Sequence, residues 1–269
     1  GERLDVSFPE RGITVGRFIL APVTGITIAR FDEGGLGGTV GAGIPIGARF
    51  GILQDLEVRA TAVPLVFAPH AGYGGLPDTE GLIGPSFGAT FRFLRGFFEM
   101  GAAADFTIRT GTGESGFLFD PGVPMRLHLG RIAALDTGLF FPISNIGVAA
   151  TGPGFKVSAS ETTGGMEIPL RFSFDAVPPR VHLLVESGVK IEDFGNAGDT
   201  FAIPLGFGGG FALPGRHGPI FDLDPFFRWP EFLTPGAQAV GAGRAKVGGD
   251  KVNAGDFETG LEFTFYLYL

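Results

Sequence analysis

The sequence predicts an all-β protein, a transmembrane antiparallel up-and-down β-barrel of about twelve strands. Three observations lead to this prediction. Apolar and polar residues alternate with a period of two along most of the chain. The connections between the alternating segments are short and long in turn. Each segment places bulky apolar residues on one face and charged residues with glycine on the other, as expected for a wall between lipid and water.

The composition agrees with a membrane barrel and excludes several other classes. The 269 residues include 47 Gly and 29 Phe, 44% of the chain is hydrophobic, and the mean hydropathy is +0.29. No apolar run is long enough for a transmembrane helix, although the chain is apolar overall. Cysteine is absent, so we expect neither a disulfide nor a thiolate metal site. The net charge of −8 and the scattered basic residues argue against nucleic acid as a partner.

Gly, Pro and Asp separate the alternating segments, which are rich in aromatic and β-branched residues, as strands are. In chain order the predicted strands are 14–31, 38–50, 55–67, 81–94, 97–109, 122–131, 134–143, 166–174, 180–191, 200–213, 218–229 and 257–269. The short connections between them are ILQD, RG, IAA, AVPP and PGRHG. The long connections include TGTGESGFLFDP and NIGVAATGPGFKVSASETTG, which we expect to be loops. Short turns at one end and long loops at the other are typical of membrane barrels.

The positions of the charges distinguish this barrel from a soluble sandwich. In FFEMGAAADFTIR (97–109), Glu99 and Asp105 share one parity, whereas Phe98 and Phe106 share the other. The stretches PMRLHLGR, MEIPLRFSFD, VHLLVESGVKI and IFDLDPFFRW repeat this arrangement. A soluble sandwich would bury its bulky face, and glycines would have no reason to follow the charges. We therefore expect phenylalanine to face lipid, and charges and glycines such as Gly130 to face a lumen.

The last stretch, ETGLEFTFYLYL, ends the chain on a strand with one wholly apolar face. This strand and the overall pattern resemble the bacterial outer-membrane β-barrel superfamily, over nearly the whole chain but without a specific family motif. The resemblance implies a location in the outer membrane with both termini in the periplasm. It also implies contact with outer-membrane lipid and lipopolysaccharide, and recognition of the terminal strand by the barrel assembly machinery. We expect residues 1–269 to form one barrel domain, with 1–12 as a periplasmic N-terminal extension.

A second regularity is an apolar–Pro–apolar pattern inside eight segments. Proline removes a donor from the sheet and belongs at strand ends, edges or bulges. We expect these prolines to form a belt towards the long loops, where regular pairing ends or where strand tips bend. They are Pro45, Pro64, Pro85, Pro124, Pro142, Pro169, Pro204 and Pro225.

The inward parity identifies the candidate functional residues, which are charged side chains expected to line the lumen. They are Arg49, Glu57, Arg59, Arg92, Glu99, Asp105, Arg126, His128, Asp136, Glu167, Arg171, His182, Glu186, Asp222, Asp224, Glu258 and Glu262. These charges suit a narrow channel for passive diffusion of small polar or cationic solutes, which is the leading hypothesis. They also suit a lumen filled by its own ion pairs. In that alternative, a structural or scaffolding barrel binds partner proteins through its outer face or long loops.

Catalytic and metal chemistry find little support in the sequence. No HExxH motif or close histidine pair is present, and the acidic loop pieces lack the spacing of a Ca²⁺ loop. We expect no cofactor. Ser173 and His182, with Glu186 near them, could meet across the AVPP turn, but such a set is catalytic only with an oxyanion site and substrate access. A lipid-modifying enzyme is therefore a third hypothesis, behind the channel and the scaffold.

Overall fold

The computed structural model describes residues 7–31, 39–67, 83–110, 114–152, 155–197, 201–233 and 257–269. The strands are β1 (Ile19–Phe31), β2 (Thr39–Leu53), β3 (Leu56–Phe67), β4 (Ile83–Leu94), β5 (Phe98–Thr110), β6 (Glu114–His128), β7 (Ala133–Phe140), β8 (Ile143–Gly152), β9 (Phe155–Gly164), β10 (Met166–Val177), β11 (Val181–Ile191), β12 (Phe201–Pro214), β13 (Pro219–Leu233), β14 (Phe257–Phe265) and β15 (Leu267–Tyr268). Two 3₁₀ turns, η1 (Phe8–Glu10) and η2 (Phe194–Asn196), are also present. Within the described ranges, no helix has the length and apolar character needed to cross a membrane.

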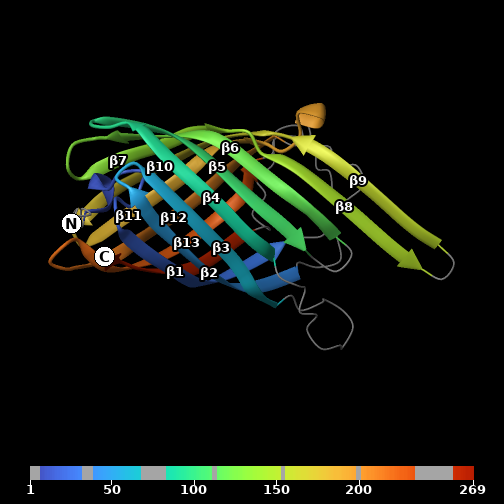
Figure 1. Ribbon diagram of the computed structural model, residues 1–269, viewed down its shortest axis with the longest axis horizontal. Helices are drawn as coiled ribbons and strands as arrows, with labels where there is room; N and C mark the ends of the chain where they lie inside the picture. The colour runs from blue at the N-terminus through green and yellow to red at the C-terminus, as the bar shows by residue number, and fades with distance from the viewer. Residues whose placement is uncertain are drawn as a thin grey trace.

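The sheet closes into a barrel of twelve antiparallel strands, as predicted (Figure 1). Neighbouring strands follow one another from β1 to β7, continue from β10 to β14, and close where β14 pairs with β1. At this seam Val23 lies opposite Thr264 and Arg30 lies opposite Phe257. β15 extends the seam by pairing with the start of β1. Closure leaves the barrel wall without a free edge, which is how a sheet can span a membrane.

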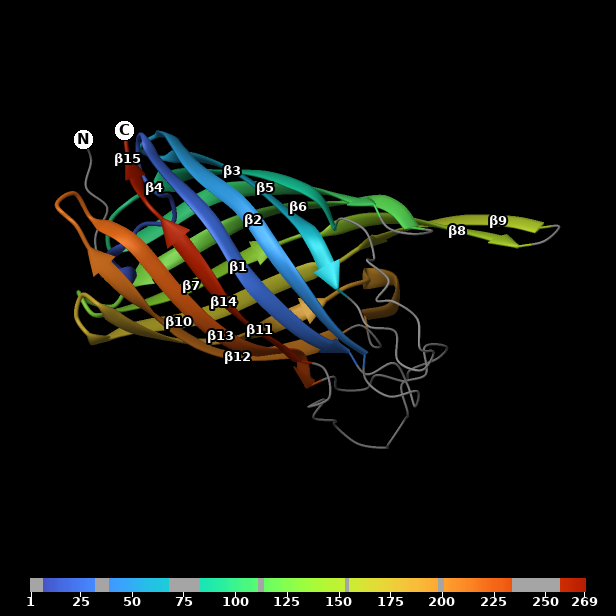
Figure 2. The ribbon, with the colours of Figure 1, turned by 90° about the horizontal axis from the view of Figure 1, so that it is seen from below.

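The two ends of the barrel differ. Short turns join β2 to β3, β4 to β5, β6 to β7, β10 to β11 and β12 to β13 at one end, which we call the turn rim. Ser7, where the described residues begin, and Leu269 both lie at this rim, and the Leu269 N–H donates to the Phe18 carbonyl 3.0 Å away (Figures 1 and 2). The opposite end, the loop rim, carries the long connections, most of which lie outside the described residues.

β8 and β9 form a hairpin that projects past the loop rim (Figure 2). β6 pairs with β7 over its last part and with β8 over its first part, Glu114–Phe119. The stretches expected as loops, 110–121 and 145–164, are therefore largely strand, and that expectation was wrong. Gly, Ser, Thr and Ala are frequent in these stretches, and this composition is typical of loops, which is why the strands were not recognised.

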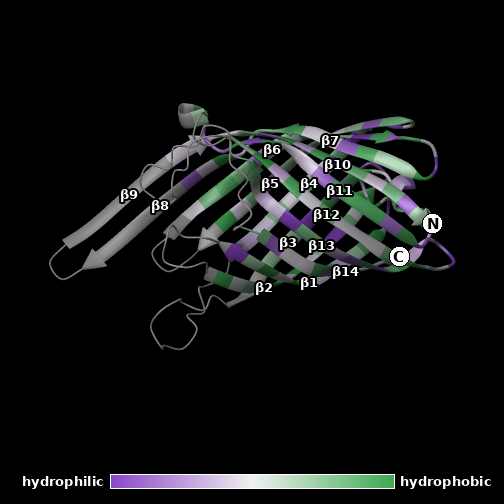
Figure 3. Ribbon diagram, turned by 180° about the vertical axis from the view of Figure 1, so that it is seen from behind, coloured by the Kyte–Doolittle hydropathy of each residue, from purple (hydrophilic) through white to green (hydrophobic). Residues whose placement is uncertain are grey.

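Apolar and polar residues alternate along the strands of the barrel, as the colours of Figure 3 show. Phe87, Phe91 and Phe93 of β4 are 53%, 49% and 55% exposed on the outside. Their inward neighbours include Thr90, which is buried, and Arg92. Because large apolar side chains are costly to expose to water, this surface is that of a membrane-spanning barrel.

Most strand boundaries differ from the predicted ones by a few residues, and two of these differences bear on the lumen. Residues 14–18 are not the start of the first strand, because β1 begins at Ile19. Gly130 does not line the lumen within a strand: β6 ends at His128, and Gly130 has a φ of +77° in the turn that leads to β7. Glycine adopts this left-handed conformation without steric cost, which accounts for its position there.

Several prolines coincide with breaks in pairing. The register of β2 against β3 shifts between Ile44 and Ile46, around Pro45, and that of β12 against β13 shifts around Pro204. Pro142 lies between β7 and β8, next to Phe141, whose N–H donates to the Pro121 carbonyl at 2.9 Å. At these three positions the missing proline donor falls where the sheet is already irregular.

Candidate functional site: the lumen and the segment across the turn rim

The lumen wall is crossed by ion pairs between strands. Arg126 lies opposite Asp136 and donates to it through Nη2 at 2.7 Å, and Arg228 lies opposite Glu258 with an Nε–Oε2 distance of 2.6 Å. Other arginine–carboxylate pairs of the wall include Arg49–Glu57, Arg59–Asp105, Arg92–Glu99 and Arg171–Glu186. Such pairing limits the desolvation cost of charges inside a narrow barrel.

Residues 7–18, which we call the N-terminal segment, lie inside the barrel across the turn rim. The Ser7 hydroxyl donates to the Arg131 carbonyl in the β6–β7 turn at 3.4 Å. Seven residues later, the Thr14 hydroxyl donates to the Gln54 carbonyl in the β2–β3 turn at 3.2 Å. The segment therefore bridges turns that belong to different sides of the rim. The described part of the expected extension, residues 7–12, is in contact with the wall.

Arg11 is the central polar anchor of the segment. Its guanidinium donates to both carboxylate oxygens of Asp222, with an Nη2–Oδ1 distance of 3.0 Å, and to the Tyr266 hydroxyl at 3.1 Å. The side chains of Arg11 and Asp222 are only 7% and 2% exposed. The Tyr266 hydroxyl also donates to Asp222 at 2.7 Å. The main chain of Arg11 is also bound, because the Arg126 guanidinium donates to the Arg11 carbonyl. A buried carboxylate needs such partners, because alone it would be strongly destabilised.

Phe8 and Pro9 fix the beginning of the segment. The Phe8 ring stacks on the His182 imidazole with centroids 4.4 Å apart and an interplanar angle of 15°. The guanidinium groups of Arg11 and Arg126 lie 5.4 and 5.6 Å from the Phe8 ring centroid, within the range of cation–π attraction. The Pro9 carbonyl lies 2.9 Å from Nδ1 of His128. The phenyl group is thus held by one imidazole and two cations.

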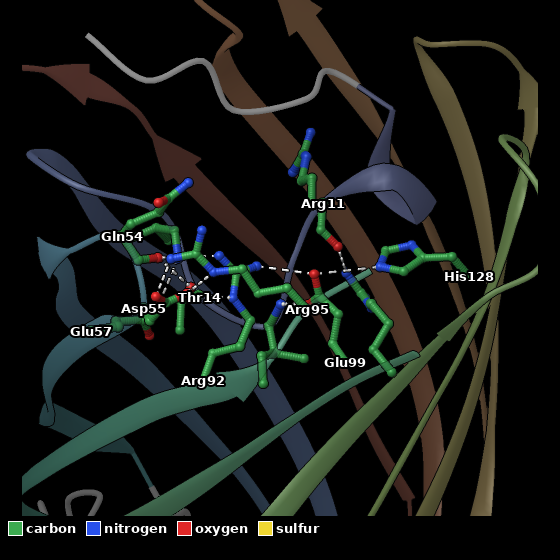
Figure 4. A network of polar contacts seen from close by, with 12 residues as sticks. Arg11, Thr14, Gln54, Asp55, Glu57, Arg92, Arg95, Glu99 and His128 are labelled. Carbon is green, nitrogen blue, oxygen red and sulfur yellow. Dashed lines mark hydrogen bonds and ion pairs between the residues drawn. The ribbon is translucent and has the colours of Figure 1, made fainter. Parts of the chain in front are cut away.

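Two wall glutamates bind the main chain of the segment. The N–H of Ile13 donates to Glu99 Oε2, and the N–H of Val15 donates to Glu57 Oε2, both at 2.9 Å. Each glutamate is itself held by an arginine of the wall, and Figure 4 shows Arg92 beside Glu99. Arg49 donates to both oxygens of Glu57 at 2.8 Å, and Arg92 Nη1 lies 3.0 Å from Glu99 Oε1. The lumen charges therefore position carboxylates that accept backbone hydrogen bonds from the segment.

A cluster of charges in the adjoining turns supports this arrangement. Arg92 Nε donates to Asp55 Oδ1 at 3.0 Å, and Arg95 donates to both oxygens of Asp55 (Figure 4). The hydrogen bonds from Arg95 are the main reason that the pKa of Asp55 is lowered from its usual 3.8. Arg92 thus links Asp55 in the turn to Glu99 in the lumen, which bonds the segment.

Close packing and a backbone reversal complete the site. A Cβ added to Gly51 of β2 would lie 1.5 Å from the Gly16 carbonyl oxygen, so only glycine fits there. Val15 packs with Ile19, Ala21 and Tyr266 in an apolar cluster at the turn rim. Gly16 and Phe18 have φ values of +86° and +58°, and they turn the chain from the segment into β1. A positive φ is unusual for phenylalanine, which identifies this reversal as a conformation that its surroundings impose.

Between the segment and the rest of the wall lies a cavity of about 710 Å³. Residues 11–15 of the segment line it on one side, and the strand residues Arg49, Arg171, Glu186, Lys190 and Arg228 line it on others. Pro124, Pro169 and Pro204 of the expected belt also line it. A cavity of this volume holds a small molecule or a group of waters.

The structure brings most candidate residues to this lumen, in two groups. Glu57, Glu99, Arg126, His128, His182 and Asp222 contact the N-terminal segment. Arg49, Arg59, Arg126, Asp136, Glu167, Arg171, Glu186 and Glu258 line the cavity. Arg92 and Asp105 pair with members of these groups. Asp224 Oδ1 lies 3.0 Å from His182 Nε2, and Glu262 lies opposite Asp224 in the β13–β14 register.

Four functional residues were not among the candidates. Phe8 and Arg11 were missed because the segment has no periodic pattern that would relate it to the lumen. Tyr266 shares the inward parity of Glu262, and Arg228 shares that of Asp222, so the alternation could have identified both. Arg11 and Asp222 lie 211 residues apart in the sequence, so the alternation of residues within a strand cannot predict their contact.

The described geometry does not assemble the Ser173–His182 pair into a catalytic set. Ser173 is fully buried, and its hydroxyl donates to the Ala134 carbonyl at 3.4 Å. Ser173 lies opposite Leu184 in the strand register, whereas His182 lies opposite Asp175 and stacks on Phe8. A nucleophile and its base must share a hydrogen bond, and these two side chains bond elsewhere.

Comparison with known proteins agrees with this architecture. No protein-family profile matches the chain, and no curated protein sequence matches it. Among solved structures, it is similar to the β domain of the Bordetella autotransporter BrkA, with a TM-score of 0.56 and 14% identity over 91% of this chain and 98% of that one. It is also similar to the translocator domain of the autotransporter NalP from Neisseria meningitidis, with a TM-score of 0.50 and 12% identity over 93% and 88%. The chain thus has the twelve-stranded fold of bacterial outer-membrane β-barrels.

Proposed function

We propose that this protein is an outer-membrane channel for passive diffusion of small polar solutes, and that the N-terminal segment narrows it at the turn rim. The observation that carries the proposal is the charged cavity of about 710 Å³ inside the barrel. A barrel that served only as a scaffold would gain stability by filling this volume with side chains. Ion pairs between neighbouring strands line the cavity and keep it polar. They also produce an electric field across the lumen through which a solute would pass.

The lining favours neutral and anionic solutes over the cations expected from the sequence. Basic side chains outnumber acidic ones around the cavity, because the acidic partners Glu57, Asp105 and Asp222 lie behind their arginines. Arg171 is the clearest example, since its side chain is 44% exposed in the lumen although it pairs with Glu186. A solute in the cavity therefore meets guanidinium groups more often than carboxylates.

The proposal places the protein in the bacterial outer membrane, with the turn rim and both termini in the periplasm. The exposed phenylalanines would then contact outer-membrane lipid, and the loop rim would contact lipopolysaccharide. The strand that ends at Leu269 would be read by the barrel assembly machinery. These assignments rest on the apolar outer band and on the shared rim of turns and termini.

Ion currents through the purified full-length chain in planar bilayers test the channel. We expect small unitary currents and a reversal potential in a KCl gradient that shows preference for chloride. Arg171→Gln should lower that preference by up to about fivefold, since two unit charges 4 Å apart interact by about 1 kcal/mol in water. Arg180→Gln, in the exposed β10–β11 turn, is the matched control and should leave the preference unchanged.

A second function, a scaffold barrel with a closed lumen, is favoured by one specific observation. The N-terminal segment spans the turn rim and is bonded on both sides of it. If neither the natural chain nor the Arg11→Ala variant carries current, the channel proposal fails and the scaffold, which would bind partner proteins through its outer face or loops, takes its place.

A further inference from the structure

The N-terminal segment is attached to the barrel in two different ways. After the reversal at Gly16, the Phe18 N–H bonds the Gly51 carbonyl at 2.7 Å and the Phe18 carbonyl accepts from Leu269. These are main-chain bonds to two strands of the wall. Before the reversal, residues 7–15 join no strand of the sheet and are held mainly by wall side chains. Their departure would break no sheet pairing, so the segment can leave without loss of the barrel.

The wall side of the site is organised without the segment. Glu57 keeps its two hydrogen bonds from Arg49, and Glu99 keeps Arg92. Asp222 keeps the Tyr266 hydroxyl at 2.7 Å. These groups come from β2, β3, β4, β5, β13 and the end of the chain, which the closed sheet fixes relative to one another. A vacated site therefore retains its shape and its carboxylates, which is the condition for binding another ligand at little cost in ordering.

The contacts specify what such a ligand must offer. An aromatic ring must reach His182 and Arg126, as Phe8 does, and a guanidinium must reach the buried Asp222 and Tyr266, as Arg11 does. Two main-chain N–H groups, two residues apart, must meet Glu99 and Glu57. Two main-chain N–H groups at this spacing are what an extended polypeptide presents along one side. The ligand is therefore a polypeptide with an aromatic residue followed three positions later by arginine.

We propose that the turn rim is a polypeptide-binding site, which the chain's own N-terminal segment occupies reversibly and which a second segment of the same chemistry can occupy in its place. Gly16 to Phe18 form the hinge. The proposal goes beyond the channel function and does not rest on it, because occupancy of the site can be measured without any ion current.

The test uses the full-length chain with one introduced cysteine. Thr14→Cys places a thiol at a side chain that is 3% exposed, and the natural chain contains no other cysteine. The rate of its modification by a charged maleimide reports how often the segment leaves. A synthetic peptide, SFPERGITVGRF, should raise this rate in a saturable manner. The same peptide with alanine at its fifth position, which corresponds to Arg11, should need at least tenfold higher concentrations, because Asp222 would lose its cation.

Two controls separate displacement from general loosening. Ala202→Cys, at a buried position near the start of β12 and away from the segment, should show no change with peptide. Ser7→Cys provides a second reporter in the segment if Thr14→Cys does not fold, as judged by circular dichroism. A modification rate that is unaffected by peptide up to millimolar concentration overturns the proposal. An equal rise with a scrambled peptide overturns it as well, since the site would then have no sequence preference.

Discussion

Replacement of Arg11 by alanine is the most informative perturbation of the site. The change removes one side chain from a segment that belongs to no strand, so the barrel itself should fold as before. It leaves the Asp222 carboxylate 2% exposed, with only the Tyr266 hydroxyl still donating to it. We expect the N-terminal segment to leave the turn rim far more often in this variant than in the natural chain.

The size of the effect follows from the burial of the ion pair. Removing one partner of a buried pair costs about 3 to 5 kcal/mol, because the other charge stays desolvated. We expect a cost at the lower end of this range, about 3 kcal/mol, because Tyr266 keeps its hydrogen bond to Asp222. Water can also reach the carboxylate once the segment moves. A loss of about 3 kcal/mol corresponds to roughly a hundredfold increase in the ratio of displaced to bound segment.

The rate of maleimide modification at Thr14→Cys measures this ratio when opening and closing are fast relative to labelling. Combined with Arg11→Ala, the rate should rise by roughly a hundredfold. Combined with Arg180→Ala, in an exposed turn, it should not change. A rise of less than about threefold with Arg11→Ala would show that the ion pair does not hold the segment. The account of the site given above would then be wrong.

Two further predictions concern neighbouring contacts. Gly51→Ala should displace the segment and increase both conductance and Thr14→Cys labelling, because the new Cβ would lie 1.5 Å from the Gly16 carbonyl oxygen. Gly164→Ala, where the nearest atom would be 4.0 Å away, should change neither. Asp55→Asn should flatten the acid dependence of stability. The pKa of Asp55 is lowered in the fold, so its contribution is present above its ordinary value of 3.8 and is lost as pH falls through the folded value. Acid titration of the circular dichroism signal tests this, and an unchanged profile would contradict it.

Much of the barrel was predictable because the alternation of side chains is a direct consequence of the pleat. The number of strands and the inward face were predicted from it, whereas the pairing of Arg126 with Asp136 depends on the register, which only the structure shows. The hairpin of β8 and β9 was not predictable in this way. It projects past the loop rim, and its many Gly, Ser and Ala residues have the composition of a loop.

The segment across the turn rim was beyond the reach of pattern analysis for a different reason. TVGRF, residues 14–18, alternates like the strand that follows it, so it was assigned to that strand. Its separation depends on Gly16 and Phe18, whose positive φ values reverse the chain. The contact from Arg11 to Asp222 exists only once the whole sheet has closed. Contacts of this kind arise from the assembled barrel and leave no periodic trace in the sequence.

The seam between β1 and β14 has a consequence for biogenesis. β1 and β14 lie far apart in the sequence, and neither can satisfy the main-chain groups on its seam side until both are in place. Until then both are open templates on which another chain could grow. Leu269 also donates a main-chain hydrogen bond to Phe18, the last residue of the N-terminal segment. Closure of the seam and docking of that segment at the turn rim are therefore expected to occur together. A barrel without residues 257–269 would therefore lose the seam with β1 and also the main-chain bond that Leu269 donates to Phe18.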